Sequence, residues 1–179
     1  MKKLVYALLA LGMASCGDKT SELPENQLTG NDFESLDGWI GDNVMPSLTR
    51  EKAHLGRYSA KVDPNVEYSI GYSNLLGKMS ASKLRKIKVH VWVNIPNAKT
   101  EAVLVTQVTD PGNPTASPLL WEGIKLSDKV TTYNKWVEVE KEITLPDNVT
   151  YANKIGVYLW RTAVPGTAFI DDLTITKIE

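Results

Sequence analysis

The sequence has few of the residues that build most reactive centres. Its 179 residues include one cysteine, Cys16, and two histidines, His54 and His90. A single cysteine excludes an intramolecular disulfide and a zinc site built from several cysteines. Two histidines leave little room for a metalloenzyme or a catalytic triad. The sequence contains no Gly-x-Ser-x-Gly, no His-Glu-x-x-His and no phosphate-binding glycine loop.

The chain also lacks an excess of basic residues. Twenty Lys and Arg stand against 21 Asp and Glu, which gives a formal net charge of -1. A protein that binds phosphate backbones needs a basic excess, so we expect no nucleic-acid partner. The 42% apolar fraction is too high for a disordered chain and fits one globular domain.

Long hydrophobic runs are missing apart from residues 4–13, and ten residues are too few to span a bilayer as a helix. Lys2 and Lys3 precede this run, and two small residues separate it from Cys16. A secretory signal has this layout. The segment resembles a lipoprotein signal peptide with its lipobox, Met13-Ala14-Ser15-Cys16. The alternative is a plain secreted protein with a free cysteine near its end.

The resemblance implies that residues 1–15 are removed and that Cys16 carries the lipid. Several acyl chains would hold the protein stably at a membrane. Residues 16–30 are polar, and we expect them to form a flexible tether. The acidic residues of the tether, Asp18, Glu22 and Glu25, resemble the start of surface-exposed lipoproteins from Bacteroidota. This implies a location in the cell envelope, at the outer membrane, on either its surface or its periplasmic side.

Residues 31–179 are dominated by strand patterns. Apolar and polar residues alternate in segments 86–93, 136–145 and 154–160, and Phe169, Leu173 and Ile175 indicate a last strand. Weaker patterns predict strands near residues 33–40, 57–63, 66–76, 102–109 and 118–127. Residues 77–88 predict at most a turn. Many short strands joined by Gly- and Pro-containing turns predict an all-β fold, an antiparallel two-sheet sandwich or barrel.

Three segments in order resemble the jelly-roll sandwiches of the galactose-binding-like group, in particular the carbohydrate-binding modules of families four, nine and twenty-two. The domain opens with Asn31-Asp32-Phe33-Glu34, followed by Gly38-Trp39. The element Ala53-His54-Leu55-Gly56-Arg57-Tyr58-Ser59-Ala60-Lys61-Val62 comes next. The domain closes with Ala168-Phe169-Ile170-Asp171-Asp172-Leu173-Thr174-Ile175. The resemblance implies the fold, but one fold hosts many activities.

The resemblance also implies a structural Ca²⁺ ion that ties the first and last strands to the segment around Gly56. The carboxylates carried over are Glu34 and either Asp171 or Asp172. Backbone carbonyls near Asp32 and in residues 51–56 would complete the six to eight oxygen ligands that calcium takes. Asp171 shares strand parity with Phe169 and Leu173, which favours it, but a bulge would reverse this parity. The alternative is that these acids are solvated edge residues.

Aromatic residues on the polar side of the predicted strands are the candidate ligand surface. An aromatic ring can pack on the C–H side of a sugar while polar neighbours bind the hydroxyls. The candidates for such a surface are Trp92, Trp160, Tyr158, Trp121, His90 and Arg161, with Lys88 and Glu122 as further polar neighbours. The alternative is that these rings only cover their own sheet. We expect Trp39, Trp136, Tyr68 and Tyr72 to pack in the core or at its edges.

The sequence therefore predicts a lipid-anchored extracytoplasmic module that binds a polysaccharide or oligosaccharide without cleaving it. One alternative is a structural or adhesion module that docks a surface protein. Another is a jelly-roll polysaccharide lyase or glycosidase. A lyase could use His90, Tyr158 and Arg161, and a glycosidase could use Glu138, Glu140 and Glu142. The three glutamates alternate along one strand, which is more typical of a solvated outer face.

Overall fold

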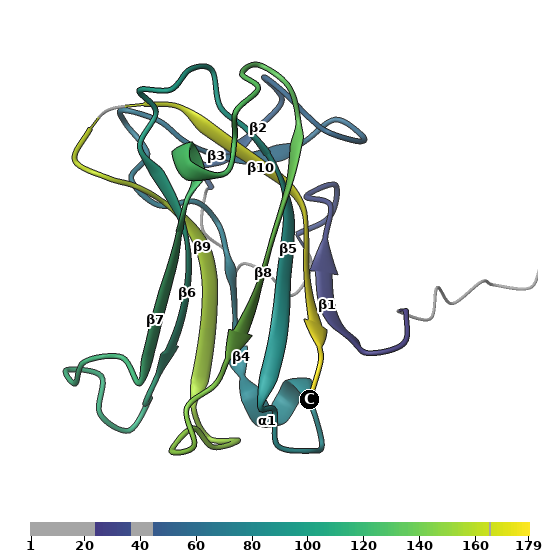
Figure 1. Cartoon of the computed structure of the whole chain (residues 1–179), viewed down its shortest axis with the longest axis vertical. Helices are drawn as coiled ribbons and strands as arrows, with labels where there is room; N and C mark the ends of the chain where they lie inside the picture. Colours follow the sequence, from purple (N-terminus) through teal and green to yellow (C-terminus); the bar gives the residue numbers. More distant parts are fainter. Residues whose placement is uncertain (1–23, 37–44, 165) are drawn as a thin grey trace, which may run out of the picture.

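The structure, a computed structural model, describes residues 24–36, 45–164 and 166–179 (Figure 1). Its ordered elements are mostly strands, with one turn of α-helix, α1 (Leu76–Met79), and one 3-10 turn, η1 (Leu126–Asp128). The strands found in the described part of the chain are β1 (Gln27–Asn31), β2 (Leu48–Thr49), β3 (Ser59–Val62), β4 (Tyr72–Leu75), β5 (Lys86–Asn94), β6 (Ala102–Thr109), β7 (Leu120–Lys125), β8 (Val137–Thr144), β9 (Lys154–Arg161) and β10 (Ala168–Lys177).

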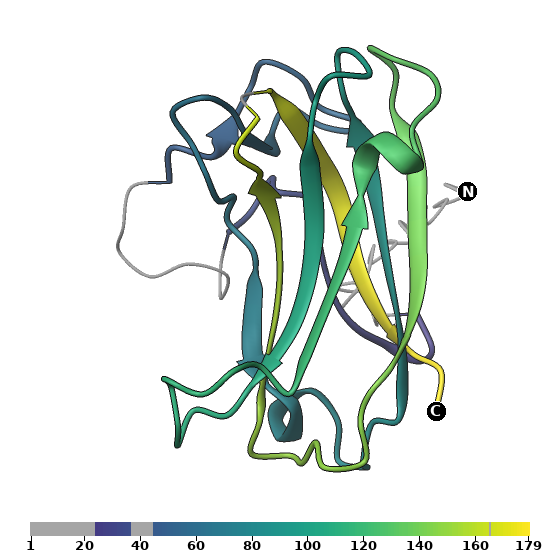
Figure 2. The ribbon, with the colours of Figure 1, turned by 60° about the vertical axis from the view of Figure 1, so that its left-hand side comes forward.

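The strands form two antiparallel sheets that lie as layers (Figures 1 and 2). The six-stranded sheet has the order β2-β3-β10-β5-β8, and β1 pairs with β10 beside β3. The four-stranded sheet has the order β4-β9-β6-β7. Neighbours that are far apart in sequence, such as β5 and β10, require crossovers between the sheets. These features are those of a jelly-roll sandwich.

The core lies between the two sheets because each long strand buries every second side chain. In β5, Ile87, Val89, Val91 and Val93 are fully buried, whereas the residues between them are partly exposed. In β9, Ile155, Val157 and Leu159 are fully buried in the same way. Both sets belong to one continuous hydrophobic core. Each sheet therefore keeps a second, outer face.

The predicted strands at 86–93, 102–109, 136–145, 154–160 and 118–127 are confirmed to within a few residues as β5, β6, β8, β9 and β7. The strand predicted at 66–76 is wrong over its first half, since β4 covers only Tyr72–Leu75. Of the strand predicted near residues 33–40, residues 33–36 form no strand, and Phe33 there has a left-handed φ of 56°. Residues 37–40 lie outside the described part of the chain. Residues 77–79 do form a short helical turn, as part of α1.

The boundary predicted between tether and domain at residue 30 is wrong by a few residues. Gln27–Asn31 pairs with β10 through four registered positions, so the folded part begins at β1 rather than at residue 31. Cys16, the signal segment 1–15 and Trp39 lie outside the described residues. In the part that the structure describes, no helix is long and apolar enough to cross a membrane.

Candidate functional site

The predicted ligand residues fall on two different faces of the molecule. Trp92 and His90 lie on β5, in the six-stranded sheet, and Trp121, Tyr158 and Trp160 lie on β7 and β9, in the four-stranded sheet. All five side chains alternate with core residues, so they point away from the core. Because the two outer faces look in opposite directions, the predicted residues cannot line one site. The prediction of a single surface is therefore wrong.

The outer face of the six-stranded sheet is occupied by charge pairs. His90 Nε2 lies 2.7 Å from Glu138 Oε1, and Lys88 Nζ lies 3.4 Å from Glu140 Oε2. Lys86 pairs with Glu142 in the same ladder. The hydrogen bond from Lys86, followed by its positive charge, lowers the pKa of Glu142.

The glutamates are thus paired along one solvated face, as the alternation predicts, and they do not surround a cleft. The lyase hypothesis is also unsupported, since His90 and Tyr158 lie on opposite faces of the sandwich.

Trp92 is covered by the segment that precedes β3. The ring of His54 stacks on Trp92 with 3.9 Å between ring centroids and an interplanar angle of 13°. Trp136 contacts His54 edge-on at 5.8 Å, and His54 Nδ1 lies 2.6 Å from Asp172 Oδ2. One face of the Trp92 indole is therefore already used within the protein. Trp92 and His90 are better explained as structural residues.

The outer face of the four-stranded sheet carries aromatic rings over a short apolar floor. Across the strands, Trp160 is registered with Val103, and Tyr158 with Val105. In the next row, Gln107 of β6 lies between Gly156 of β9 and Trp121 of β7; these rows are defined by the strand pairing. Val103 and Val105 are only 5% and 0% exposed although they are not part of the central core. Side chains on this outer face cover them. We call the surface formed by Trp160, Tyr158, Gln107 and Trp121 the aromatic face.

Tyr68 adds a ring that the alternation pattern missed. It forms an isolated antiparallel bridge with Trp160, and its ring meets Tyr158 edge-on at 5.9 Å. Its exposure of 53% contradicts the core position predicted for it, whereas Tyr72 is buried as predicted. The alternation pattern predicts the wrong side for Tyr68 because residues 67–71 run beside β9 without forming a regular strand. Only the tertiary structure brings Tyr68 to the aromatic face.

A hollow of about 400 Å³ opens between these rings. It lies where β4 meets β9 and β6, and it is lined by Tyr68, Ser69, Gly71, Tyr72, Ser73, Gln107, Gly156 and Tyr158. Gly71 is required here, because a β-carbon would lie 2.3 Å from the carbonyl oxygen of Val157 and 2.6 Å from Tyr158 Cβ. The lining combines the exposed ring of Tyr68 and the half-buried ring of Tyr158 with hydroxyl and amide groups, which is the composition that suits a polar ligand with apolar faces.

Trp121 borders this face on the side of β7. Its indole lies across Gly123, close enough that a β-carbon at residue 123 would be 2.8 Å from indole Cη2. The side chain is 50% exposed. The ring thus presents a broad surface on the same side as Tyr158 and Gln107.

The polar groups beside Tyr158 and Trp160 include two phenols, which are neutral at physiological pH, and one carboxylate. Burial raises the pKa of Tyr158. Burial, followed by a hydrogen bond to Glu67, raises the pKa of Tyr68. Both phenols therefore keep their protons and can donate as well as accept hydrogen bonds. The carboxylate is that of Glu67, which accepts a long hydrogen bond of 3.4 Å from Trp160 Nε1.

Arg161 and Glu122 do not contribute to this face. Strand alternation places the side chain of Arg161 on the opposite side from Trp160, and its Nε is buried without a hydrogen-bond partner. Glu122 alternates with Trp121 and pairs with Lys141 of β8 at 2.6 Å. This ion pair joins the edges of the two sheets. The predicted ligand role of Arg161 is therefore not supported.

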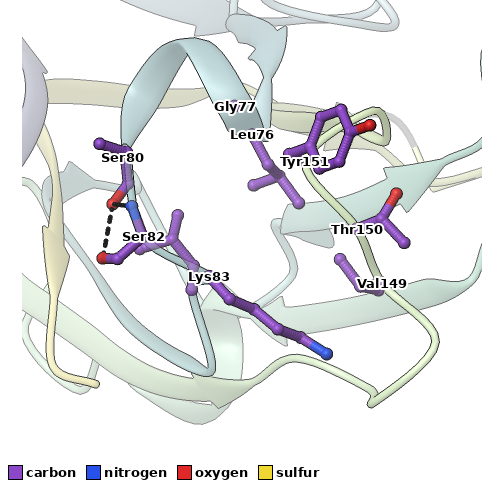
Figure 3. A pocket seen from close by; sticks show the side chains of 10 residues that line it. Leu76, Gly77, Ser80, Ser82, Lys83, Val149, Thr150 and Tyr151 are labelled. Carbon is purple, nitrogen blue, oxygen red and sulfur yellow. Dashed lines mark hydrogen bonds between the residues drawn. The ribbon is translucent and has the colours of Figure 1, made fainter.

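A larger hollow of about 450 Å³ lies at the end of the sandwich where α1 meets the β8–β9 connection (Figure 3). Its buried lining is aliphatic, with Leu76, Leu84 and Val149, and Tyr151 stands at its rim. Lys83 Nζ donates to the carbonyl of Asp147 at 2.8 Å, and the Ser80 and Ser82 hydroxyls are hydrogen-bonded to each other. These polar groups of the hollow are thus already hydrogen-bonded within the protein. The aromatic face is therefore the stronger candidate site.

Three of the side chains predicted to hold calcium, those of Glu34, Asp171 and Asp172, contact segment 51–58. Glu34 Oε1 accepts hydrogen bonds from the backbone N–H groups of Arg57 and Tyr58 at 2.5 and 2.6 Å. Asp171 Oδ2 accepts from the backbone N–H of His54 at 2.7 Å. Asp32 lies apart from the segment. It is exposed, and its Oδ1 accepts a hydrogen bond from the backbone N–H of Glu34 at 3.1 Å.

Asp171 is fully buried, but by segment 51–58 rather than by the core. A register shift between Asp171 and Thr174 reverses the strand parity, and Asp172 has a φ of 49°. Burial raises the pKa of Asp171 to about 6. No group of three His, Cys, Asp or Glu side chains arranged to hold a metal occurs among the described residues. A cation would offset the buried charge, but backbone carbonyls would have to supply most of its ligands.

No protein-family model matches the chain, and no curated protein matches it. Among solved structures it is similar to a xylan-binding domain of carbohydrate-binding module family 22 from Paenibacillus barcinonensis, with 19% identity and a TM-score of 0.54. That match covers 86% of this chain and 95% of the other. A family 16 carbohydrate-binding module matches with 17% identity and a TM-score of 0.52 over 79% and 92% of the two chains. The jelly-roll sandwich of the carbohydrate-binding modules is thus confirmed.

Proposed function

We propose that the protein binds carbohydrate without cleaving it, through the aromatic face of the four-stranded sheet. The observation that carries the proposal is the gathering of Tyr68, Trp121, Tyr158 and Trp160 on one outer face. Sugar rings have apolar C–H faces that pack on aromatic rings, and hydroxyl edges that need polar partners. Gln107 and the hydroxyl of Ser73 are such partners at the hollow. The carbohydrate-binding module fold supports the same function.

The arrangement of the candidate catalytic glutamates favours binding over cleavage. In the part of the chain that the structure describes, the candidate acids of the six-stranded sheet are paired with Lys86, Lys88 and His90. Glycoside hydrolysis needs two carboxyl groups facing each other across a bound sugar. The glutamates Glu138, Glu140 and Glu142 share one side of β8 and so cannot face each other in this way.

The test is a binding panel of neutral polysaccharides. Xylan, mixed-linkage β-glucan, cellulose-derived oligosaccharides and β-1,4-galactan would be screened by affinity gel electrophoresis and then by titration calorimetry. We expect at least one of them to bind, and we expect no reducing ends to form during long incubation. If no glycan binds over a broad panel, the protein-docking alternative becomes the better account. New reducing ends would contradict the non-catalytic part of the proposal.

Lipid anchoring at Cys16 remains part of the proposal, with the cell envelope as the location. The supporting evidence is the lipobox pattern in the sequence. Mass spectrometry of the purified membrane-bound protein should find an acylated N-terminal cysteine, and Cys16→Ala should release the protein from membranes. Retention of the Cys16→Ala protein in the membrane fraction would contradict the anchor.

We also propose a structural calcium ion, which the resemblance seen in the sequence implies. Asp171 and Glu34 are the side chains that would hold the ion, and both already contact segment 51–58. The ion would neutralise the buried Asp171 carboxylate and tie the start and end of the domain to that segment. The test of this proposal is a stability measurement, which is argued below at the scale of the whole molecule.

A further inference from the structure

Glu67 is held in a defined place at one end of the aromatic face. Its backbone carbonyl accepts the N–H of Arg161 at 2.8 Å, which fixes the residue beside the last position of β9. The next residue, Tyr68, bridges to Trp160. The backbone of Glu67 is therefore positioned by β9, although residues 67–71 do not form a regular strand.

The carboxylate of Glu67 contacts the polar edges of two rings of this face. Trp160 Nε1 donates to Glu67 Oε1 at 3.4 Å. After burial, the next cause of the raised pKa of Tyr68 is its hydrogen bond to Glu67, followed by the negative charge of that residue. An ionised carboxylate offers about four lone-pair sites, so two ring donors leave acceptor capacity for a ligand. The residue itself is exposed and accessible.

Other charges near the aromatic face lie farther from these rings or are engaged elsewhere, such as Glu101, whose carboxylate accepts a hydrogen bond from Thr162 Oγ1 at 3.4 Å. Glu122 pairs with Lys141 at the edge of the sandwich, on the inner side of β7. Lys125 is registered with Val103 and is therefore two strands away from Trp160. Lys154 lies at the far end of β9. Glu67, by contrast, is hydrogen-bonded to the rings themselves.

We propose that Glu67 is a specificity-determining residue that accepts hydrogen bonds from sugar hydroxyls and disfavours sugars that carry carboxylates. The inference rests on the proposed glycan-binding function of the same face. Hydrogen bonds to a charged acceptor are about twice as strong as those between neutral groups. A neutral sugar whose hydroxyl donates to Glu67 therefore binds more tightly. A ligand carboxylate brought to within about 5 Å of Glu67 is repelled, and salt weakens this repulsion.

The experiment compares Glu67→Gln with the wild-type protein. The ligands are two matched pairs: cellohexaose with its C6-oxidised hexamer, and xylohexaose with a xylohexaose bearing one glucuronic acid branch. Glutamine keeps an oxygen that can accept from Trp160 Nε1 but removes the charge. Titration calorimetry would be run at about 20 mM and 500 mM NaCl. Glu138→Gln is the matched control, because it removes a carboxylate from the opposite outer face.

We expect the wild-type protein to prefer the neutral member of a bound pair by at least about fivefold at low salt, and less at high salt. Glu67→Gln should reduce that preference about threefold or more and weaken binding of the neutral ligand by a similar factor. Glu138→Gln should change neither quantity.

If the wild-type protein binds but Glu67→Gln leaves both the affinity and the preference unchanged, this inference is overturned and the proposed function stands. If the wild-type protein binds no ligand of either pair and no glycan of the wider panel, both are overturned.

Discussion

Two tryptophans with the same sequence environment have different roles in the structure. Trp92 and Trp160 each alternate with buried aliphatic residues, so both point away from the core. The ring of His54 covers Trp92, whereas Trp160 lies beside Tyr68 on the opposite sheet. Local alternation tells which side of a strand a residue occupies, but not which sheet or which covering segment it meets.

This difference leads to a paired prediction. Trp160→Ala should lower the affinity for a bound polysaccharide about tenfold or more, because it removes a ring from the aromatic face. Trp92→Ala should leave the affinity unchanged and lower the free energy of unfolding by about 2 kcal/mol, because it removes a half-buried ring and its stacking contact with His54. Titration calorimetry and urea denaturation measure the two effects. Equal losses of affinity in the two variants would contradict the placement of the site.

The salt-bridge cluster around Lys61 should make stability depend on pH. Lys61 Nζ lies 2.8 Å from Asp63 Oδ2 and also pairs with Glu51, and the Lys61 and Asp63 side chains are only 16% and 14% exposed. Burial opposes ionisation of Asp63, but the hydrogen bonds from Lys61 and from the Asn65 N–H outweigh it and lower the pKa of Asp63.

Because the pKa is lower in the folded state, this stabilisation is complete above the unfolded value of about 4 and is lost as pH falls through the folded value. We expect Asp63→Asn to lower the free energy of unfolding by about 1 kcal/mol at pH 7 and to have almost no effect near pH 2. Chemical denaturation across this pH range provides the measurement. A difference that stays constant down to pH 2 would mean that the ion pair does not stabilise the fold.

At the scale of elements, the irregular approach of β4 to β9 creates the hollow of the aromatic face. Residues 67–70 follow β9 through isolated hydrogen bonds, such as Ser69 N–H to the Leu159 carbonyl at 2.9 Å. Gly71 allows the chain to pass against Val157 and Tyr158 before β4 begins at Tyr72. A side chain at position 71 has no room. The position of Tyr68 and the shape of the hollow therefore depend on this one glycine.

Gly71→Ala should disturb both stability and binding. The new β-carbon would meet backbone oxygen, which cannot rotate away, so we expect the free energy of unfolding to fall by about 2 kcal/mol or more. The affinity for glycan should fall as well, because Tyr158 must move. Gly112→Ala is the control, since its β-carbon would meet only the flexible side chain of Asp110 at 3.2 Å. A Gly71→Ala protein with wild-type stability and affinity would contradict the close packing.

A second element-scale feature is the bulge in β10. The sequence pattern places Phe169, Asp171 and Leu173 on one face, but the register shift after Asp171 puts Leu173 in the core and leaves Asp171 under segment 51–58. An uninterrupted strand would have turned either the leucine or the aspartate to the wrong side. The bulge thus lets one strand serve both the core and the junction with that segment.

The whole molecule brings both ends of the domain to one place. β1 and β10 are paired, and Glu34 and Asp171 both bind the segment that leads into β3. If calcium occupies this junction, 1 mM CaCl₂ should raise the melting temperature by several degrees and EDTA should lower it. Asp171→Asn should abolish the calcium-dependent shift. The absence of any shift in the wild-type protein would show that the hydrogen bonds at the junction suffice without the ion.

The sequence by itself determined the fold class and most of the long strands. Alternating apolar residues are a local property, and burial of every second residue follows from strand geometry wherever the strand lies. The same pattern correctly assigned the glutamates of β8 to a solvated face and Tyr158, Trp160 and Trp121 to outward positions. Short strands such as β2, and β1 with its polar composition, carry too few apolar residues for the pattern to reveal them.

Only the tertiary structure decided which outward residues form a site. The order of strands in the two sheets separates Trp92 and His90 from Trp160, and no local signal encodes that order. The irregular segment before β4 carries Tyr68 and Glu67 to the aromatic face, against the parity of the pattern. The shortage of cysteine and histidine had already excluded a zinc site built from several cysteines and left little room for a metalloenzyme or a catalytic triad. What remained, a set of rings, becomes a candidate binding surface only because long-range pairing places four of them on one outer face.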